Sequence, residues 1–314
     1  MKKFLVFILI IAALLIIGGG LLFASAVKNN KNKVVTNTYI ADDSFTSIDI
    51  DISTSDLVFA KTIDSQVKVV CVEREKEVHS VEVKDNTLYV KYVDNRKFYE
   101  KFFDLAFADR KVTVYLPEYT YDNLKINAST GNIDMPKEFS FDDVDIKVST
   151  GNVTLRGTVN NNAKIEGSTS NIYINEFKAN NVQIKTTTGD IKLENVEVTN
   201  DITVNLSTGH TSIKNVKANN FNLKASTGKV TLTNTIINDK ITIETSTGDI
   251  KFEDADAGSL NVKTTTGDVT GTLLTSKIFH AKSNTGHIDV PPTTSGGLCE
   301  INTDTGDIKI NIKN

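Results

Sequence analysis

The chain repeats one short turn, of the form S/T-T-G-D/N-I, along most of its length. When the copies are aligned on the Gly, ten of them follow one another at intervals of 19 or 20 residues. An internal repeat with this period is typical of a solenoid or an array, in which each unit packs only on its neighbours. The aligned positions are Gly131, Gly151, Ser170, Gly189, Gly209, Gly228, Gly248, Gly267, Gly286 and Gly306.

The residues around each Gly alternate between apolar and polar side chains. Apolar residues stand seven and five positions before the Gly and two positions after it, as Ile241, Ile243 and Ile250 do around Gly248. Alternation over five or six residues indicates strands with one buried face, and β-branched residues suit a pleated surface. We therefore expect inward positions such as Ile146, Ile184 and Ile243 to be buried.

Each repeat is expected to turn two corners. The Gly column requires a positive φ, and an Asn/Asp column nine residues before it, such as Asn180 and Asn200, tolerates left-handed backbone angles. Two short strands then leave a third, looser side of about six residues. This pattern predicts an all-β fold, a right-handed parallel β-solenoid of about ten coils spanning roughly 48 Å over residues 121–314. The Thr before every Gly would form a ladder of hydroxyl groups.

Two other repeat architectures fit less well. A β-propeller needs about 40 residues per blade, and no doubled period is present. The nonapeptide of calcium-binding β-rolls is absent as well.

The N-terminus predicts a membrane anchor. Residues 4–23 are uncharged and apolar, long enough for a transmembrane helix, and they follow Lys2 and Lys3. We assign residues 1–27 as a transmembrane signal-anchor and 28–39 as a polar tether, with the C-terminal bulk extracytoplasmic. Cleavage after Ala26, at an A-x-A sequence, is the alternative.

Residues 40–120 are expected to hold a divergent first coil, with Ser55 in the Gly slot, and a β-rich cap. Asp85-Asn86 predicts a hairpin turn, and residues 111–116 predict a strand that ends at Pro117. The chain stops while still in the repeat. This predicts an open C-terminal edge that is either blunted by Lys309 and Lys313 or docked end to end on another molecule.

The segment 95–111 combines five aromatic residues with five basic ones. It is interpreted as a loop or short helix whose aromatics plug the end of the rod. Contact with a membrane surface or with a protein partner is the alternative.

The composition favours no nucleic-acid partner, because the formal net charge is −4. The two cysteines, Cys71 and Cys299, are too far apart in sequence to suggest a disulfide framework. No nucleotide, serine-hydrolase or zinc-protease motif occurs. The sequence thus predicts no enzyme, no catalytic residue, no cofactor and no metal site.

The strongest candidate for chemistry is the position after the Gly. Asp249 and Asp268 share this column in adjacent coils, and the column continues with His287 and Asp307. As a site, these residues could form a metal or acid–base cluster. As a turn, they occupy a position where Asn and Asp belong, which is the interpretation that we prefer. His210 shares the column with His287, but it lies too far away to bind the same metal.

The order of these elements resembles a known family. A membrane span, the divergent sequence VTVYLPEYTYDNLKI, and serial STGNI and TTGDI turns resemble the bacterial putative-adhesin family of unknown function. The resemblance covers about residues 40–314, and its clearest motif lies between Val112 and Ile133. It implies a membrane-anchored β-solenoid of the kind linked to cell-envelope stress operons in Gram-positive bacteria. It supplies no catalytic residues.

We therefore expect a non-enzymatic, single-pass membrane protein whose extracytoplasmic rod binds a cell-wall polymer or an envelope protein. Two alternatives remain at this stage. One is a polysaccharide-acting β-helix enzyme that uses Asp249 and Asp268. The other is a polymerising scaffold.

Overall fold

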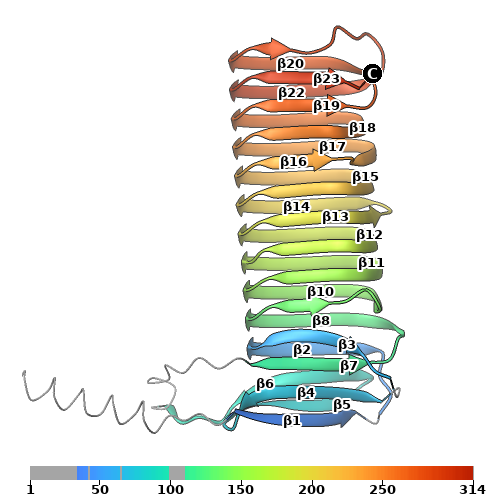
Figure 1. Cartoon of the computed structure of the whole chain (residues 1–314), viewed down its shortest axis with the longest axis vertical. Coiled ribbons are helices and arrows are strands. Elements are labelled where there is room, and N and C mark those ends of the chain that lie inside the picture. Colours follow the sequence, from blue (N-terminus) through green and yellow to red (C-terminus); the bar gives the residue numbers. More distant parts are fainter. Residues whose placement is uncertain (1–33, 42, 64–65, 99–109, 314) are drawn as a thin grey trace, which may run out of the picture.

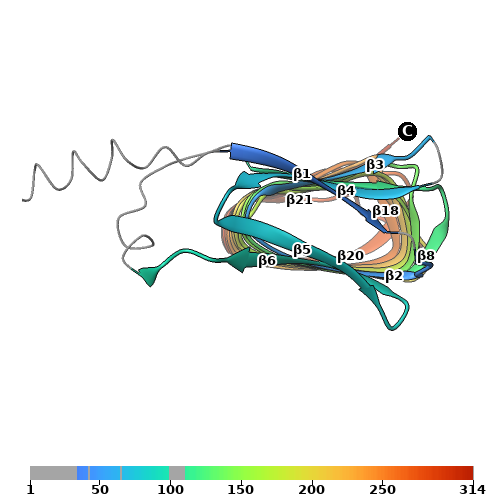
Figure 2. The ribbon, with the colours of Figure 1, turned by 90° about the horizontal axis from the view of Figure 1, so that it is seen from below.

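The computed structural model describes residues 34–41, 43–63, 66–98 and 110–313. Its elements are β-strands stacked into a straight rod (Figure 1), and the cross-section is a flattened oval with two long sides (Figure 2). In this part of the chain, no helix is long and apolar enough to span a membrane. The predicted anchor at 1–27 and most of the predicted tether lie outside the described residues.

The first seven strands build the near end of the rod. They combine parallel and antiparallel pairing. They are β1 (Val34–Ala41), β2 (Ser47–Thr54), β3 (Asp56–Lys61), β4 (Val67–Arg74), β5 (Glu77–Lys84), β6 (Thr87–Asp94) and β7 (Lys111–Leu116).

The remaining strands build the stacked coils, here called rungs, and every pairing among them is parallel. They are β8 (Thr120–Thr130), β9 (Ile133–Met135), β10 (Ser140–Thr150), β11 (Val153–Thr169), β12 (Ile172–Thr188), β13 (Ile191–Val198), β14 (Asp201–Thr208), β15 (Thr211–Thr227), β16 (Val230–Thr233), β17 (Ile236–Thr247), β18 (Ile250–Thr266), β19 (Val269–Leu273), β20 (Lys277–Thr285), β21 (Ile288–Asp289), β22 (Gly297–Thr305) and β23 (Ile308–Ile312).

The expected solenoid and its inward columns are confirmed. Ile146, Ile184 and Ile243 are each 0 % exposed, within one continuous apolar core that runs along the rod. Equivalent residues of neighbouring rungs are paired in register, as Ile184 is with Val204. The Gly corner is confirmed too, because the glycines of this column have φ between 132° and 153°.

The second corner was predicted at the wrong position. The left-handed residue lies six positions after the Gly, at Glu176, Asn195, Asn215, Asn234 and Asp254, with φ between 46° and 55°. The Asn/Asp column nine residues before the Gly has no positive φ in the described rungs. The chain bends there through a register shift between neighbouring rungs, as between Ala218 and Asn220, so a left-handed residue is not needed.

The third side of the middle rungs is more regular than expected. After the left-handed corner the chain continues as strand, and Phe177 pairs with Val196 while Ala179 pairs with Val198. These four side chains point inward and are at most 6 % exposed. The looser side is therefore another buried strand, which thickens the core.

The near end is closed by a change of strand direction. β2 and β3 form the first rung, with Ile50 paired to Ile126 of β8. Below them, β6 and β7 add a parallel rung, and β5 and β4 then pair with these strands in antiparallel fashion. β1 lies outermost, antiparallel to β4. The expected hairpin is confirmed, because Asp85 and Asn86 both have positive φ between β5 and β6.

The far end departs from the order of the sequence. β22 pairs with β18 on one side and with β20 on the other, and β23 lies between β19 and β21 in the same way. The last rung of the chain is thus inserted beneath the rung that precedes it in sequence (Figure 1). The prediction that the C-terminal end of the chain forms the open edge is wrong. The outermost rung is β20–β21, and Lys313 forms an ion pair with Asp254 at 2.5 Å.

Candidate functional site

The Gly corner brings the backbones of successive rungs into very close contact. A Cβ atom on Gly151 would lie 2.0 Å from the carbonyl oxygen of Gly131, and the same approach recurs along the column. Ser170 is the exception, because it is absent from the positive-φ residues and its side chain is buried. It occupies the space beside Gly167, where a Cβ would lie 2.8 Å from the Cβ of Ser170.

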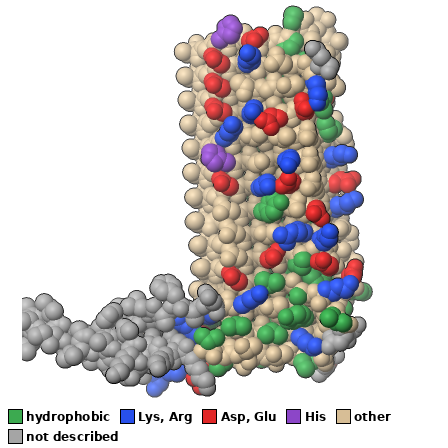
Figure 3. Space-filling model, viewed as in Figure 1, with side chains coloured by type: hydrophobic (Ala, Val, Ile, Leu, Met, Phe, Trp, Pro, Cys, Tyr) green, Lys and Arg blue, Asp and Glu red, His purple; other side chains and the backbone are tan. Residues whose placement is uncertain are grey.

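The residues after the Gly lie one above another along this corner, where Asp and His side chains form a column (Figure 3). Insertion of the last rung places Asp249, Asp268, Asp307 and His287 on consecutive rungs. The backbone N–H of Asp268 donates to Asp249 at 3.1 Å, that of Asp307 to Asp268 at 2.8 Å, and that of His287 to Asp307 at 2.7 Å. Each carboxylate thus accepts the backbone N–H of the next rung.

Asn residues do the same work elsewhere in the column. The N–H of Asn152 donates to the side chain of Asn132 at 3.0 Å. An imidazole can also serve, since the N–H of Lys229 donates to Nδ1 of His210 at 3.0 Å. The arrangement supports the turn interpretation of Asp249 and Asp268.

The threonine hydroxyls behave differently from the expectation. The Thr column directly before the Gly is exposed, and its backbone carbonyls accept the N–H of Gly from the neighbouring rung. Hydroxyl hydrogen bonds are found instead three residues before the Gly, where Thr245 donates to Thr264 at 2.9 Å. Those hydroxyls are inside the rod and are satisfied there.

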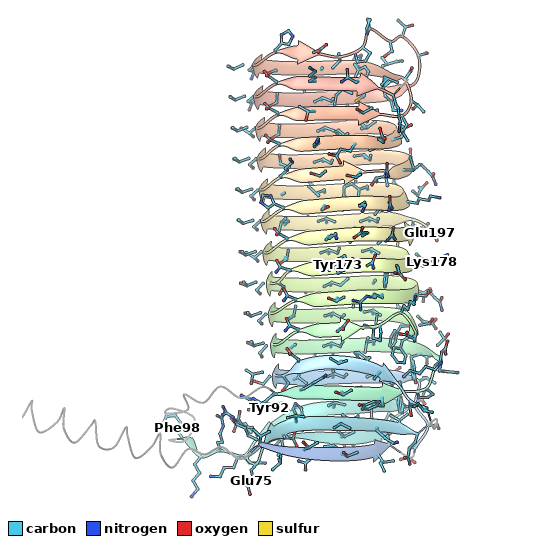
Figure 4. The ribbon with its side chains drawn as sticks, viewed as in Figure 1. Glu75, Tyr92, Phe98, Tyr173, Lys178 and Glu197 are labelled. Carbon is cyan, nitrogen blue, oxygen red and sulfur yellow. The ribbon has the colours of Figure 1, made fainter. Side chains whose placement is uncertain are left out.

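The front face, which carries the strands that follow each Gly, pairs its charges internally. Lys192 and Lys214 both contact Glu194, at 2.8 and 2.9 Å, and together they lower the pKa of that carboxyl to about 2. Lys192 also lies over the ring of Tyr173, in the middle of this face (Figure 4). At the edge opposite the Gly corner, Lys178 pairs with Glu197 at 3.1 Å.

The back face, which carries the strands that precede each Gly, has a regular row of lysines four residues before the Gly. Lys147, Lys185, Lys224 and Lys263 stand on every second rung, which corresponds to a spacing of roughly 9.6 Å. Lys282 continues the row at the far end, two rungs beyond Lys263. We call these five residues the lysine row.

A shallow groove of about 470 Å³ lies on the back face between two members of the lysine row. Its cationic walls are Lys147 and Lys185, with Glu166 between them. The remaining polar lining consists of Asp51, Asn127 and several hydroxyl side chains, including Ser149 and Ser168. The groove therefore offers ammonium and hydroxyl donors on an open surface.

A buried ionic cluster occupies the near end, where the sequence predicted only a cap. Glu77 is 2 % exposed and accepts hydrogen bonds from Tyr92, Arg110 and Arg74 at 2.7, 2.7 and 2.8 Å. Burial alone would raise the pKa of Glu77, but these hydrogen bonds and the positive charge of Arg110 lower it. Arg96 adds a contact at 3.2 Å.

A second buried group lies beside it. Glu73 accepts hydrogen bonds from Asn37 at 2.6 Å and from the backbone N–H of His79 at 2.8 Å, and its carboxylate lies 2.7 Å from Nδ1 of His79. Ligand atoms of Cys71, Glu73 and His79 lie within 4.8 Å of one another, a donor set that suits a soft divalent cation. Burial, followed by the charge of Glu73, raises the pKa of Cys71 to about 12, so the thiol is protonated at neutral pH. Glu73 is satisfied by these neighbours, whereas Nε2 of His79 is buried without a hydrogen-bond partner among the described residues.

Most of the aromatic-basic segment lies outside the described residues. Arg96 and Arg110, at its two ends, belong to the buried cluster around Glu77. Phe98 is 83 % exposed beside the near end (Figure 4). The predicted roles of the segment 95–111 as a plug, a membrane contact or a partner site stay predictions.

Comparison with known proteins supports the same architecture. The model of the family described as Toastrack DUF4097 matches residues 45–202 and 197–314. A putative adhesin from Parabacteroides merdae is similar in structure, with 15 % identity, a TM-score of 0.53, and coverage of 78 % of this chain and 98 % of that one. A putative adhesin from Parabacteroides distasonis has 13 % identity, a TM-score of 0.53, and coverage of 90 % and 98 %. No curated protein matches the chain.

Proposed function

The chain belongs to the Toastrack DUF4097 family, and we propose that it is a non-enzymatic, adhesin-like protein of the cell envelope whose rod binds an anionic wall polymer. The N-terminal apolar segment would hold it in the membrane, with the rod on the extracytoplasmic side. A link to envelope stress is part of the same proposal. The names of the two Parabacteroides proteins agree with an adhesive role.

The lysine row is the observation that carries the proposal. A polymer with a repeated anionic group gains most from cations that recur at a fixed spacing along one face. The row supplies ammonium groups roughly 9.6 Å apart, with hydroxyl donors beside them. Among the described residues, Lys224 of the row pairs with Glu244 at 3.1 Å, whereas Lys147, Lys185 and Lys263 form no ion pair. The front face suits such a ligand less, because Lys192, Lys214 and Lys251 all pair with carboxylates.

Binding of this kind is weak per contact and gains strength from repetition. It is also electrostatic, so salt should weaken it. Phosphate and carboxylate polymers of the wall both meet these requirements.

The non-enzymatic part of the proposal is supported by the arrangement of the acidic residues. Asp249 and Asp268 accept backbone N–H groups of the neighbouring rungs, which gives them a structural role. A glycosidase would need two carboxyls held on either side of a sugar.

Co-sedimentation tests the proposal. Full-length protein in mild detergent would be mixed with purified Gram-positive cell walls at low and high salt. We expect binding that falls several-fold as salt rises, and a further loss in Lys147→Ser/Lys185→Ser. Lys192→Ser/Lys251→Ser is the matched control on the front face. Equal loss in both variants, or no binding by the wild type, would contradict the proposal.

A further inference from the structure

The far tip of the rod, made of β20, β21 and residues 290–296, is open. Phe279, Ala281 and Val290 continue the inward columns of the rod but are only half-buried, and Ile288 is 38 % exposed. In the rung below, the corresponding Cys299 and Ile301, like Ile308, are 0 % exposed. The apolar core of the rod therefore reaches solvent at this tip. The loop 290–296 arches over one side of it (Figure 1).

The backbone at the tip is directed at one more rung. Throughout the rod, the N–H of each corner Gly donates to the Thr carbonyl of the next rung outward, as Gly306 does to Thr285 at 3.0 Å. The N–H of the residue two positions after the Gly also donates outward, to the carbonyl of the residue that follows the Gly in the next rung, as Ile308 does to His287 at 2.9 Å. By this pattern, the N–H groups of Gly286 and Ile288 point to a position that no described residue fills.

The opposite end shows how such an edge is closed in this fold. β6 and β7 pair in parallel with the rung above them, and they are covered on the outside by the antiparallel strands β5 and β4. The inward residues of β7, Val112 and Val114, are 0 % exposed beneath this cover. A parallel rung edge of this rod thus accepts antiparallel strands as its cap.

We propose that the far tip is a self-association surface, on which a second copy of the chain docks tip to tip. A two-fold axis perpendicular to the rod reverses or exchanges the strands of the outer rung, so the two tips meet with antiparallel strands. Each β20–β21 rung then covers the open edge of its partner with antiparallel strands, as β4 and β5 cover the rung at the near end. Because the contact is isologous, it closes as a dimer and does not propagate into a filament.

The dimer places the near ends of the two rods, each with its strand β1, at opposite ends of a doubled rod. This geometry differs from the wall-binding proposal, which concerns the sides of the rod. Tip pairing does not depend on wall binding, and either can fail without the other.

Spin labels on the full-length chain measure the predicted geometry. Asn284→Cys lies on the tip rung, and Ser207→Cys occupies the same exposed column five rungs further in. The native Cys71 and Cys299 are buried. In a tip-to-tip dimer, double electron–electron resonance should give a short intermolecular distance at position 284. The distance at 207 should be longer by twice the axial depth, roughly 48 Å.

A matched pair of substitutions tests the surface itself. Ala281→Lys directs a charge into the covered interior of the dimer but leaves it solvated at an open tip, so the monomer still folds. His280→Lys adds the same side chain on the outward face of β20. Sedimentation should show a concentration-dependent dimer for wild type and His280→Lys, and a monomer with unchanged melting for Ala281→Lys. A monomeric wild type, a dimer that survives Ala281→Lys, or a shorter distance at 207 than at 284 would each overturn the inference.

Discussion

The carbonyl oxygen of Gly189 lies 2.1 Å from the point where Gly209 would carry a Cβ atom. The corner is therefore tight because one backbone passes directly over another, and its φ of 145° is closed to other residues. This relationship explains why one turn is written so many times along the chain.

The first prediction concerns this contact. Gly209→Ala must move one of the two rungs, because the atom in the way is backbone. We expect a loss of stability of about 3 kcal/mol or more, measured by urea unfolding. Ser170→Ala is the control in the same column, since a Cβ is already accommodated there, and it should change stability by less than about 1 kcal/mol. Similar losses in the two variants would show that the corner does not depend on this approach.

The second prediction separates a structural carboxylate from a metal or acid–base group. Asp268→Asn keeps an oxygen that can accept the N–H of Asp307, as Asn132 does for Asn152, so melting should change little. Asp268→Ala removes the acceptor and should cost about 1 kcal/mol. In titration calorimetry with Ca²⁺, the wild type and Asp268→Asn should give the same heat. A binding heat that is present in the wild type and absent in Asp268→Asn would identify a cation site.

The regular part of the rod could be predicted because the period of the sequence determines which residues point inward and where one corner lies. Strand alternation and a 19-to-20-residue period identify inward residues such as Ile184, and the Gly column identifies one corner. The second corner was misplaced because Asn and Asp occur at two positions in the repeat. Only one of these, represented by Asn195 and Asn215, has a left-handed backbone.

The inserted last rung could not be predicted. Rungs with the same columns fit one another in almost any order, so the sequence of Gly286 and Gly306 does not decide which lies outermost. The buried cluster in the cap did leave a signal. Glu73 and His79 stand at inward positions of β4 and β5, where the alternating pattern otherwise places mostly apolar residues such as valine. A charged residue at an inward position needs a buried partner.

The third prediction concerns pH. The pKa of Glu77 is lowered in the folded protein below its ordinary value of about 4.5, so its ionised form stabilises the fold. This contribution is complete above about pH 5 and is lost as the pH falls through the folded-state pKa. Glu77→Gln leaves buried arginines without their carboxylate and should cost about 3 kcal/mol at pH 7. The gap between wild type and variant in urea unfolding should shrink below pH 4.5. A constant gap down to pH 3 would mean that the charge of Glu77 is not the stabilising element.

The last prediction uses the two buried thiols as reporters of the two ends. Cys71 lies in the closed cap, and Cys299 lies in the inserted rung beneath the open tip. Burial raises the pKa of both to about 12, so each must be exposed by opening before it reacts with a thiol reagent at pH 8. Opening the tip breaks the contacts of one rung, whereas opening the cap also breaks the cluster around Glu77.

We therefore expect Cys299 to react faster than Cys71 in pulsed labelling, with Cys71→Ala and Cys299→Ala assigning the two phases. If the tip pairs with a second copy, the Cys299 phase should slow as protein concentration rises, and it should become independent of concentration in Ala281→Lys. The Cys71 phase should not respond to either change, because the cap is closed by strands of its own chain. A faster Cys71 phase would mean that the cap, with its buried charges, is the weaker end of the rod.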